Sequence, residues 1–361
     1  MKRILPVLLT ITLLLCACQK QESSADIHLS WTFSNINMNG EFYTDSNRAL
    51  HFFDFTSMKE AYVCSKPNCT HYEGSDCTAL GMVNHPTIIG DSICFFQEEM
   101  TFDSDRKPLS NTSLYKANID GSGRRKISTL EGFRFSHYDM AVVVGEDIYF
   151  TAVKADFDLE SYSETGLTTG IFIGCNLKTG EFTDYGEIFK GYYANALIDG
   201  VYKNAIYLSI SYMDEKVGIE MFEAEHFEEL QKTYSRKYLK FDLETKTIKE
   251  SDMPEMPKHI CEGYYVYMEG MDTIAIDSTG KKTVYENLDS SDSSIVNGYL
   301  FTRFGERKAA ELSSGKVFEL NKSVIDEASE VIYYLDGHYI LRDGNKYDSV
   351  GESELIGAEI K

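Results

Sequence analysis

One motif recurs along the chain: an apolar stretch that ends in an acidic or amide residue and enters a short polar turn rich in Ser, Thr, Gly and Lys. Its acidic or amide positions are Asp54, Asp120, Asn176, Asp242, Asp277, Glu311 and, in the weakest copy, Asp343. The last four positions are 35, 34 and 32 residues apart, and the earlier spacings of 66, 56 and 66 residues suit the same unit with insertions. A period of about 20–50 residues indicates a repeat architecture.

Each unit reads as β-strands. Met140–Val144 and Ile148–Val153 flank a Gly-Glu-Asp turn, and Ser294–Val296 and Tyr299–Arg303 flank an Asn-Gly turn, which is a strong hairpin signal. The 24 tyrosines and 21 phenylalanines also favour strands. Four short strands per unit predict an all-β fold, a single β-propeller with seven blades, six or eight being the alternatives.

The ends of the ring can be placed from the same pattern. The first blade is predicted to use Ile27–Ser34, Glu41–Asp45, Ala49–Phe55 and Glu60–Cys64. The last blade uses Val331–Leu335 and Tyr339–Arg342 and closes beside the first, which removes free sheet edges. Asp or Asn at the turn between the third and fourth strands bonds the amides of its own turn, so these positions are predicted to be structural and not catalytic.

The N-terminus has the features of an export signal. Lys2 and Arg3 precede the apolar stretch Ile4–Leu15, which is short for a bilayer span and suits a signal peptide over Met1–Ala17. The sequence Leu-Cys-Ala-Cys that ends at Cys18 resembles the bacterial lipobox.

That resemblance implies that Cys18 carries acyl chains such as palmitate and anchors the protein in the cell membrane on its extracytoplasmic side. The competing interpretation is an ordinary cleaved signal with two chance cysteines. The predicted organisation is a signal peptide over 1–17, a lipidated tether over 18–25 and the propeller over 26–361.

Charge excludes one class of partner. The chain has 57 acidic and 35 basic side chains, a net charge of -22. Removing the signal removes Lys2 and Arg3, which leaves a net charge of -24. Binding to nucleic acid needs an excess of Lys and Arg to neutralise phosphates, so no nucleic-acid partner is expected.

The segment Leu114–Ser128 is the best copy of the repeat. It runs Leu-Tyr-Lys-Ala-Asn-Ile-Asp-Gly-Ser-Gly-Arg-Arg-Lys-Ile-Ser and resembles the blade motif of TolB-like and YWTD-like propellers, including bacterial lipoprotein domains of unknown function. The resemblance covers most of the mature chain as a degenerate pattern. It implies a propeller that binds a ligand more often than it catalyses a reaction, and it carries no active-site residues.

Three insertions lengthen the first half of the chain. Phe96–Asn111, Ala152–Gly170 and Tyr212–Arg236 each fall between the second and third strands of a unit, so they would form a wall on one face, where binding groups usually lie. Simple variation in loop length is the competing interpretation. Apolar residues spaced by three and four predict a helix over Val217–Tyr234.

The most specific local cluster holds Cys64, Cys69, His71 and Cys77 within 14 positions. Thiolates and an imidazole suit structural zinc or iron. The alternatives are a disulfide, which is common in exported proteins and would leave one thiol free or joined to Cys94, and coincidence.

The place of this cluster follows from the blade assignment. It would lie in a link between blades, on the same face as the three insertions, and would fix a long surface loop. Cys175 and Cys261 lie in apolar, strand-like runs and are expected to be small buried hydrophobes.

The function is narrowed by what the sequence lacks. It contains no nucleophile elbow, no His-Glu-x-x-His motif and no phosphate-binding or dinucleotide glycine loop. The leading hypothesis is a membrane-anchored binding or scaffold propeller for an extracellular peptide, protein or glycan. The alternatives are an extracellular glycan-active hydrolase or lyase and a structural envelope component. Tyrosine-rich surface at the insertions would favour binding, and converging His, Asp, Glu and Arg would favour catalysis.

Overall fold

The computed structural model describes residues 27–31, 34–37, 40–72, 75–82, 84–104, 106–136, 140–158, 163–222, 226–253, 257–303, 305–326, 328–344 and 346–360. Their secondary structure is mostly antiparallel β. The helical segments are short: η1 (Ile219–Phe222), α2 (Phe227–Thr233) and α3 (Glu352–Leu355). None of the helices in this described part is long and apolar enough to cross a bilayer.

The first part of the chain forms two four-stranded antiparallel sheets. The first comprises β2 (Ser34–Asn37), β3 (Gly40–Thr44), β4 (Leu50–Asp54) and β5 (Lys59–Tyr62). The second comprises β6 (Asn84–Ile89), β7 (Ser92–Phe102), β8 (Pro108–Asn118) and β9 (Arg125–Leu130).

The middle of the chain shares one long strand between two groups. The first group comprises β11 (Met140–Val144), β12 (Asp147–Asp158), β13 (Ser163–Asn176) and β14 (Phe182–Tyr202), with the short β10 (Arg134–Phe135) beside β12. The second group adds β15 (Ala205–Met213), β16 (Tyr234–Asp242) and β17 (Thr247–Glu250). The 21-residue β14 pairs with β13 through its first half and with β15 through its second half, so the two groups are continuous.

The C-terminal part continues the same arrangement. Its first group comprises β18 (His259–Cys261), β19 (Tyr264–Glu269), β20 (Asp272–Ile276) and β21 (Lys282–Tyr285). The next comprises β22 (Ser293–Val296), β23 (Tyr299–Thr302), β24 (Lys308–Glu311), β25 (Val317–Leu320) and β29 (Ile356–Ile360). The last comprises β26 (Glu330–Leu335), β27 (His338–Asp343) and β28 (Lys346–Gly351).

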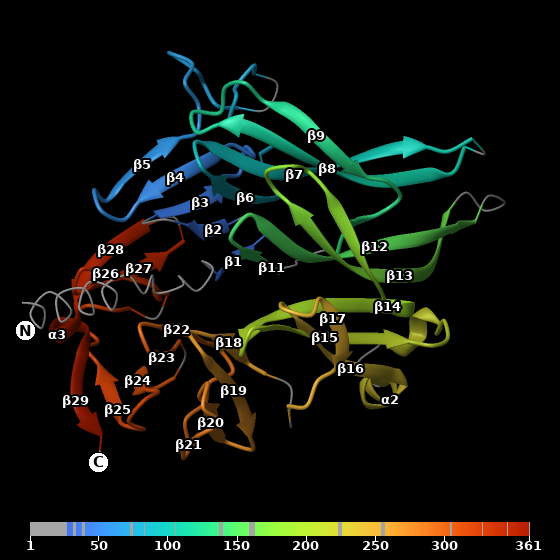
Figure 1. The fold of residues 1–361 in the computed structure, drawn as a ribbon. Helices are drawn as coiled ribbons and strands as arrows, with labels where there is room; N and C mark the ends of the chain where they lie inside the picture. Colours follow the sequence, from blue (N-terminus) through green and yellow to red (C-terminus); the bar gives the residue numbers. More distant parts are fainter. Residues whose placement is uncertain are drawn as a thin grey trace, which may run out of the picture.

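These groups form a ring, which is the arrangement of a β-propeller (Figure 1). The first strands of successive groups are neighbours: β2 contacts β6, β14 contacts β18, and β22 contacts β26. The core lies between adjacent groups, where Phe96 of β7 meets Phe150 of β12 with ring centroids 5.5 Å apart, and Phe301 of β23 meets Tyr339 of β27 at 5.2 Å. Each group therefore buries its faces against its two neighbours.

The repeated Asp and Asn residues have the structural role predicted for them. Asp54, Asp120, Asn176, Asp242 and Asp277 each accept at least one backbone N–H from their own turn, at 2.8 to 3.1 Å. These turns join the third and fourth strands of their groups.

The seventh copy is not equivalent to the others. Asp343 ends β27, the second strand of its group, so the register assigned to this copy was wrong. The physical reason is that this group begins at β26, so the run follows only its second strand, where Asp343 pairs with Lys346 of β28. The Arg-Asp-Gly-Asn run, which resembles the repeat, therefore falls one strand early.

The first strand was also misassigned. Ile27–Trp31 forms β1, which pairs over its whole length with β11, from Ile27 opposite Val144 to Trp31 opposite Met140. It is not the first strand of the first group, because β2 already pairs with that edge of β3. The backbone groups of β11 that would face an open edge are instead paired with β1.

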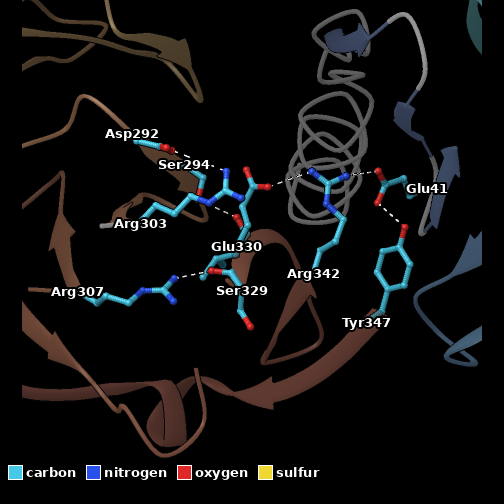
Figure 2. A network of polar contacts seen from close by, with 10 residues as sticks. Glu41, Asp292, Ser294, Arg303, Arg307, Ser329, Glu330, Arg342 and Tyr347 are labelled. Atoms are coloured by element: carbon cyan, nitrogen blue, oxygen red, sulfur yellow. Dashed lines mark hydrogen bonds and ion pairs between the residues drawn. The ribbon is translucent and has the colours of Figure 1, made fainter. Parts of the chain in front are cut away.

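The ring closes through side chains, as Figure 2 shows. Arg342 of the last group bonds the carboxylates of Glu41 in the first group and of Glu330, the latter at 3.0 Å. The Tyr347 hydroxyl donates to Glu41 at 3.0 Å, and the Tyr347 ring stacks on Phe53 with centroids 3.9 Å apart. The predicted closure of the last group beside the first is confirmed.

Candidate functional site

The three insertions become extensions of the second and third strands of their groups, as their predicted positions required. The β7–β8 and β12–β13 hairpins lengthen directly, whereas β15 and β16 are joined by η1 and α2. All three extensions lie on the right of Figure 1. The single helix predicted over Val217–Tyr234 is instead two short pieces, and Tyr234 begins β16.

Neighbouring extensions share a cavity in one case and a hydrogen bond in the other. Met100 and Phe102 of β7, together with Val153 and Lys154 of β12, line a cavity of about 330 Å³ between the first two extensions. The second extension pairs with β14 through β13. Lys216, in the third extension, donates from its ammonium group to the carbonyl of Thr165 in β13 at 3.1 Å.

A groove lies on the face of β14, β15 and β16 where the next group stops covering it. Side chains alternate along a strand, so Tyr207, Ser209 and Ser211 of β15 share one face. Tyr207 packs against Tyr265 of β19, with ring centroids 5.8 Å apart. Further along the same face of β15, Ser209 and Ser211 line the groove.

The groove has a volume of about 560 Å³ and combines aromatic rings with uncharged polar groups. Its lining consists of Tyr193, Asn195, Leu197, Ser209, Ile210, Ser211, Phe222, Leu230, Gln231, Tyr234, Arg236 and Tyr238. Among these described lining residues there is no Asp, Glu or His, and Arg236 supplies the charge. Such a lining presents flat apolar surfaces together with hydrogen-bonding groups.

The helical insertion is fixed over the groove by specific contacts. The Tyr193 hydroxyl donates to the carbonyl of Val217 at 2.9 Å, and its ring lies 4.9 Å from that of Phe222. At the other end, Arg236 donates to the Gln231 side chain at 3.0 Å. The groove is therefore held between the sheet and the insertion by both polar and aromatic contacts.

A buried carboxyl lies behind the groove. Ser209, which lines it, donates its hydroxyl proton to Asp199 at 2.6 Å. Burial raises the pKa of Asp199 to about 7, and the hydrogen bond from Ser209 offsets only part of that shift. Ionisation of Asp199 near neutral pH would place a negative charge directly behind the Ser209 side chain.

The second candidate site is the cysteine–histidine cluster, whose four predicted members the structure brings together. The ligand atoms of Cys64, Cys69, His71 and Cys77 all lie within 4.8 Å of one another. His71 Nδ1 lies 3.2 Å from Cys77 Sγ. Cys77 is buried and the other three are half-buried, and all three thiols are free of disulfides.

The loop conformation explains how four ligands converge. Asn68 and His71, which flank Cys69, adopt left-handed backbone angles with φ of 59° and 51°. The ring of His71 stacks on Tyr62 with centroids 3.8 Å apart and an interplanar angle of 8°. Backbone strain of this kind is maintained only where surrounding contacts hold it, and here it turns both ligands inward.

The thiols of the cluster differ in acidity. Burial acts to raise the pKa of Cys64, but hydrogen bonds from Thr78 and from the backbone of Lys66 outweigh it and lower the pKa to about 6. Burial and the neighbouring sulfurs of Cys69 and Cys64 raise the pKa of Cys77 to about 12. Close sulfurs therefore resist ionising together.

The cluster lies between β5 and β6, as expected, but its neighbour is the β8–β9 turn and not the face of the three extensions. Gly121, in the β8–β9 turn at the other end of β8, approaches so closely that a Cβ there would be 2.4 Å from the carbonyl oxygen of Val63. Ser65 also lies near Asp120 of that turn. The twist of each sheet brings the end of β5 towards the first residues of β9, which the order of strands alone does not reveal.

The remaining predicted cysteines have simpler surroundings. Cys18 lies outside the described residues. Cys175 is buried, as expected, and burial raises the pKa of buried Cys94 to about 11. Cys261 is half-buried as a residue, although burial raises the pKa of its thiol.

Sequence reasoning missed the groove and Asp199. The insertion that covers the groove was visible, but its floor comes from alternate residues of β14 and β15 that belong to a repeat unit. The available signal was the pair of serines at alternate positions in an otherwise apolar strand, Ser209 and Ser211.

Comparison with known proteins gives only distant structural similarity. No family model matches the chain, and no curated protein does. The cobalt-substituted apocarotenoid oxygenase of Synechocystis is 10% identical, with a TM-score of 0.41 over 80% of this chain and 67% of that one. BamB from Moraxella catarrhalis is 10% identical, with a TM-score of 0.38 over 89% and 80%. YjhT is 10% identical, with a TM-score of 0.36 over 93% and 96%. No ligand or activity is carried over from any of them.

Proposed function

We propose that the chain is an extracytoplasmic β-propeller of seven blades, anchored to the membrane through a lipid on Cys18, that binds a ligand in the groove over β14–β16. The peptide, protein and glycan classes all suit such a module, and the groove favours a glycan. The observation that carries this proposal is the lining: four aromatic residues beside amide and hydroxyl groups. These groups bond a neutral, many-hydroxyl chain while the rings pack against its apolar faces.

Catalysis is the weaker candidate for the groove. A glycoside hydrolase needs two carboxyl groups that flank the scissile bond. The described lining offers none, and Asp199 lies behind Ser209. The aromatic and amide character of the groove therefore supports binding over hydrolysis.

The groove is tested with a panel of soluble oligosaccharides and extended peptides, with affinities measured by calorimetry. Phe222→Ala should weaken binding at least tenfold, because it removes a ring from the groove that is 44% exposed and whose loss leaves the core intact. Met271→Ala is the matched control, since Met271 is 72% exposed and lies outside the groove lining.

Equal losses in both variants, or binding that Phe222→Ala leaves unchanged, would contradict a site in this groove. Turnover of any oligosaccharide in the panel would replace the binding proposal with the enzymatic one. The anchor is tested separately: Cys18→Ser should move the protein from the membrane fraction to the soluble extracytoplasmic fraction.

A further inference from the structure

The cysteine–histidine cluster has the ligand number and separations of a metal site. Three sulfurs and one imidazole nitrogen, all from the segment between β5 and β6, converge within 4.8 Å of one another. Zinc–sulfur bonds of about 2.3 Å place two ligands of a tetrahedron roughly 3.8 Å apart. The described ligand atoms therefore need only small side-chain rotations to surround one ion.

We propose that Cys64, Cys69, His71 and Cys77 bind one Zn²⁺ ion in a closed, tetrahedral, structural site. Four protein ligands fill the coordination shell and leave no position for substrate, which distinguishes a structural site from a catalytic one. His71 contributes Nδ1, the atom that already lies 3.2 Å from Cys77 Sγ. Thiolate and imidazole together suit zinc better than the oxygen-preferring Mg²⁺ or Ca²⁺.

Groups around the ligands support the same assignment. The backbone N–H groups of Lys66 and Ala79 lie near enough to Cys64 and Cys77, respectively, to act to lower the pKa of each thiol, and each belongs to the residue two positions after its sulfur. Three thiolates and one Zn²⁺ have a net charge of minus one. A nearby cation is Lys66, which pairs first with Asp76 at 2.6 Å and lies only secondarily near Cys69 and Cys64. Such outer contacts orient ligands and balance the charge of a site.

A disulfide would involve only two of the four converging side chains. Joining two of the three sulfurs would leave the third sulfur and the His71 ring without a role. The other described cysteines, Cys94, Cys175 and Cys261, lie in strands β7, β13 and β18 and form no disulfide. Zinc engages all four converging groups at once.

The metal site would stabilise the segment between β5 and β6, which packs against both the first and the second sheet. Val63, Cys77, Ala79 and Met82 are buried in one core cluster with residues of β4 and β7. The same segment pairs with the first sheet, where Leu50 donates its backbone N–H to Ala79 at 3.0 Å. A metal that closes this loop therefore stabilises the junction between the first and second sheets.

The proposal is tested on the full mature chain, purified without chelator and with cell extracts kept free of added metal. Elemental analysis should find about one zinc per chain. Thiol titration of the unfolded, chelator-treated protein should find free thiols at Cys64, Cys69, Cys77, Cys94, Cys175 and Cys261, the cysteines of the mature chain other than the lipid-bearing Cys18. Replacement of zinc by Co²⁺ should give the visible absorption bands of tetrahedral cobalt bound to thiolates.

Matched variants locate the ion. Cys69→Ser and His71→Ala should each reduce bound zinc at least tenfold at a fixed competing chelator concentration. Cys261→Ser and His338→Ala, which change a cysteine and a histidine outside the cluster, should retain it. Circular dichroism confirms that each variant is folded.

Three results would overturn the proposal. One is metal-free protein with two thiols fewer than expected, which indicates a disulfide. Another is iron in place of zinc at comparable occupancy. The third is full zinc occupancy in folded Cys69→Ser. Each is independent of whether the groove binds a ligand.

Discussion

At the scale of single residues, Asp199 makes stability depend on pH. Its pKa is raised from 3.8 to about 7 by burial, so between these values the folded chain keeps a proton that the unfolded chain has lost. Its contribution is therefore fully present below about pH 4 and is lost as pH rises through 7. Asp199→Asn should be more stable than the parent at pH 8 by about 2–4 kcal/mol, because one pKa unit corresponds to about 1.4 kcal/mol.

Urea unfolding of both proteins at pH 4, 6 and 8 measures this difference. The two stabilities should be closest at pH 4, where Asp199 is protonated in the folded chain and is only beginning to lose its proton in the unfolded chain, whose pKa is 3.8. A difference that is the same at every pH would show that Asp199 does not titrate in this range.

At the scale of elements, the β13–β14 turn depends on Asn176. Its side-chain oxygen accepts the backbone N–H groups of Lys178 and Thr179, and its amide donates to Asp147 at 2.8 Å. Asn176→Ala should destabilise the chain by about 1–3 kcal/mol, because each lost hydrogen bond contributes about 1 kcal/mol. Thermal unfolding measures the effect, with Asp343→Ala, in the copy of the motif that is out of register, expected to change the melting temperature much less.

At the scale of the whole molecule, ring closure depends on a buried carboxylate. The Glu41 side chain is fully buried and is bonded by Arg342 and Tyr347 across the junction between the first and last groups. Arg342→Ala should lower the free energy of unfolding by about 3–5 kcal/mol, because the Glu41 carboxylate stays buried after the guanidinium that pairs with it is removed. Denaturant unfolding measures the loss.

Two further variants test this interpretation of the closure. Lys316→Ala removes an exposed ion pair with Glu359, so it should cost less than about 1 kcal/mol. Combining Glu41→Gln with Arg342→Met should recover most of the stability lost in Arg342→Ala, since no buried charge remains. A double variant as unstable as Arg342→Ala would show that packing, and not charge, dominates at this junction.

The strands and turns were predictable because they depend on local chemistry. The Asn297-Gly298 hairpin has φ of 52° and 75°, the left-handed angles that favour Asn and Gly there. The apolar runs on either side of the Gly-Glu-Asp turn likewise predicted β11 and β12. The convergence of Cys64, Cys69, His71 and Cys77 followed from their closeness in sequence.

The sequence by itself determined the all-β architecture, the repeated turns, the positions of the three extensions and the members of the cysteine–histidine cluster. Only the tertiary structure decided that β1 joins β11, that the cluster lies beside the β8–β9 turn, and that Ser209 and Ser211 face an uncovered groove. These features depend on contacts between residues far apart in the chain and on the accumulated twist of whole sheets. Local propensity and spacing contain no information about such contacts, because the partner of each exposed edge or face is set by the closed ring.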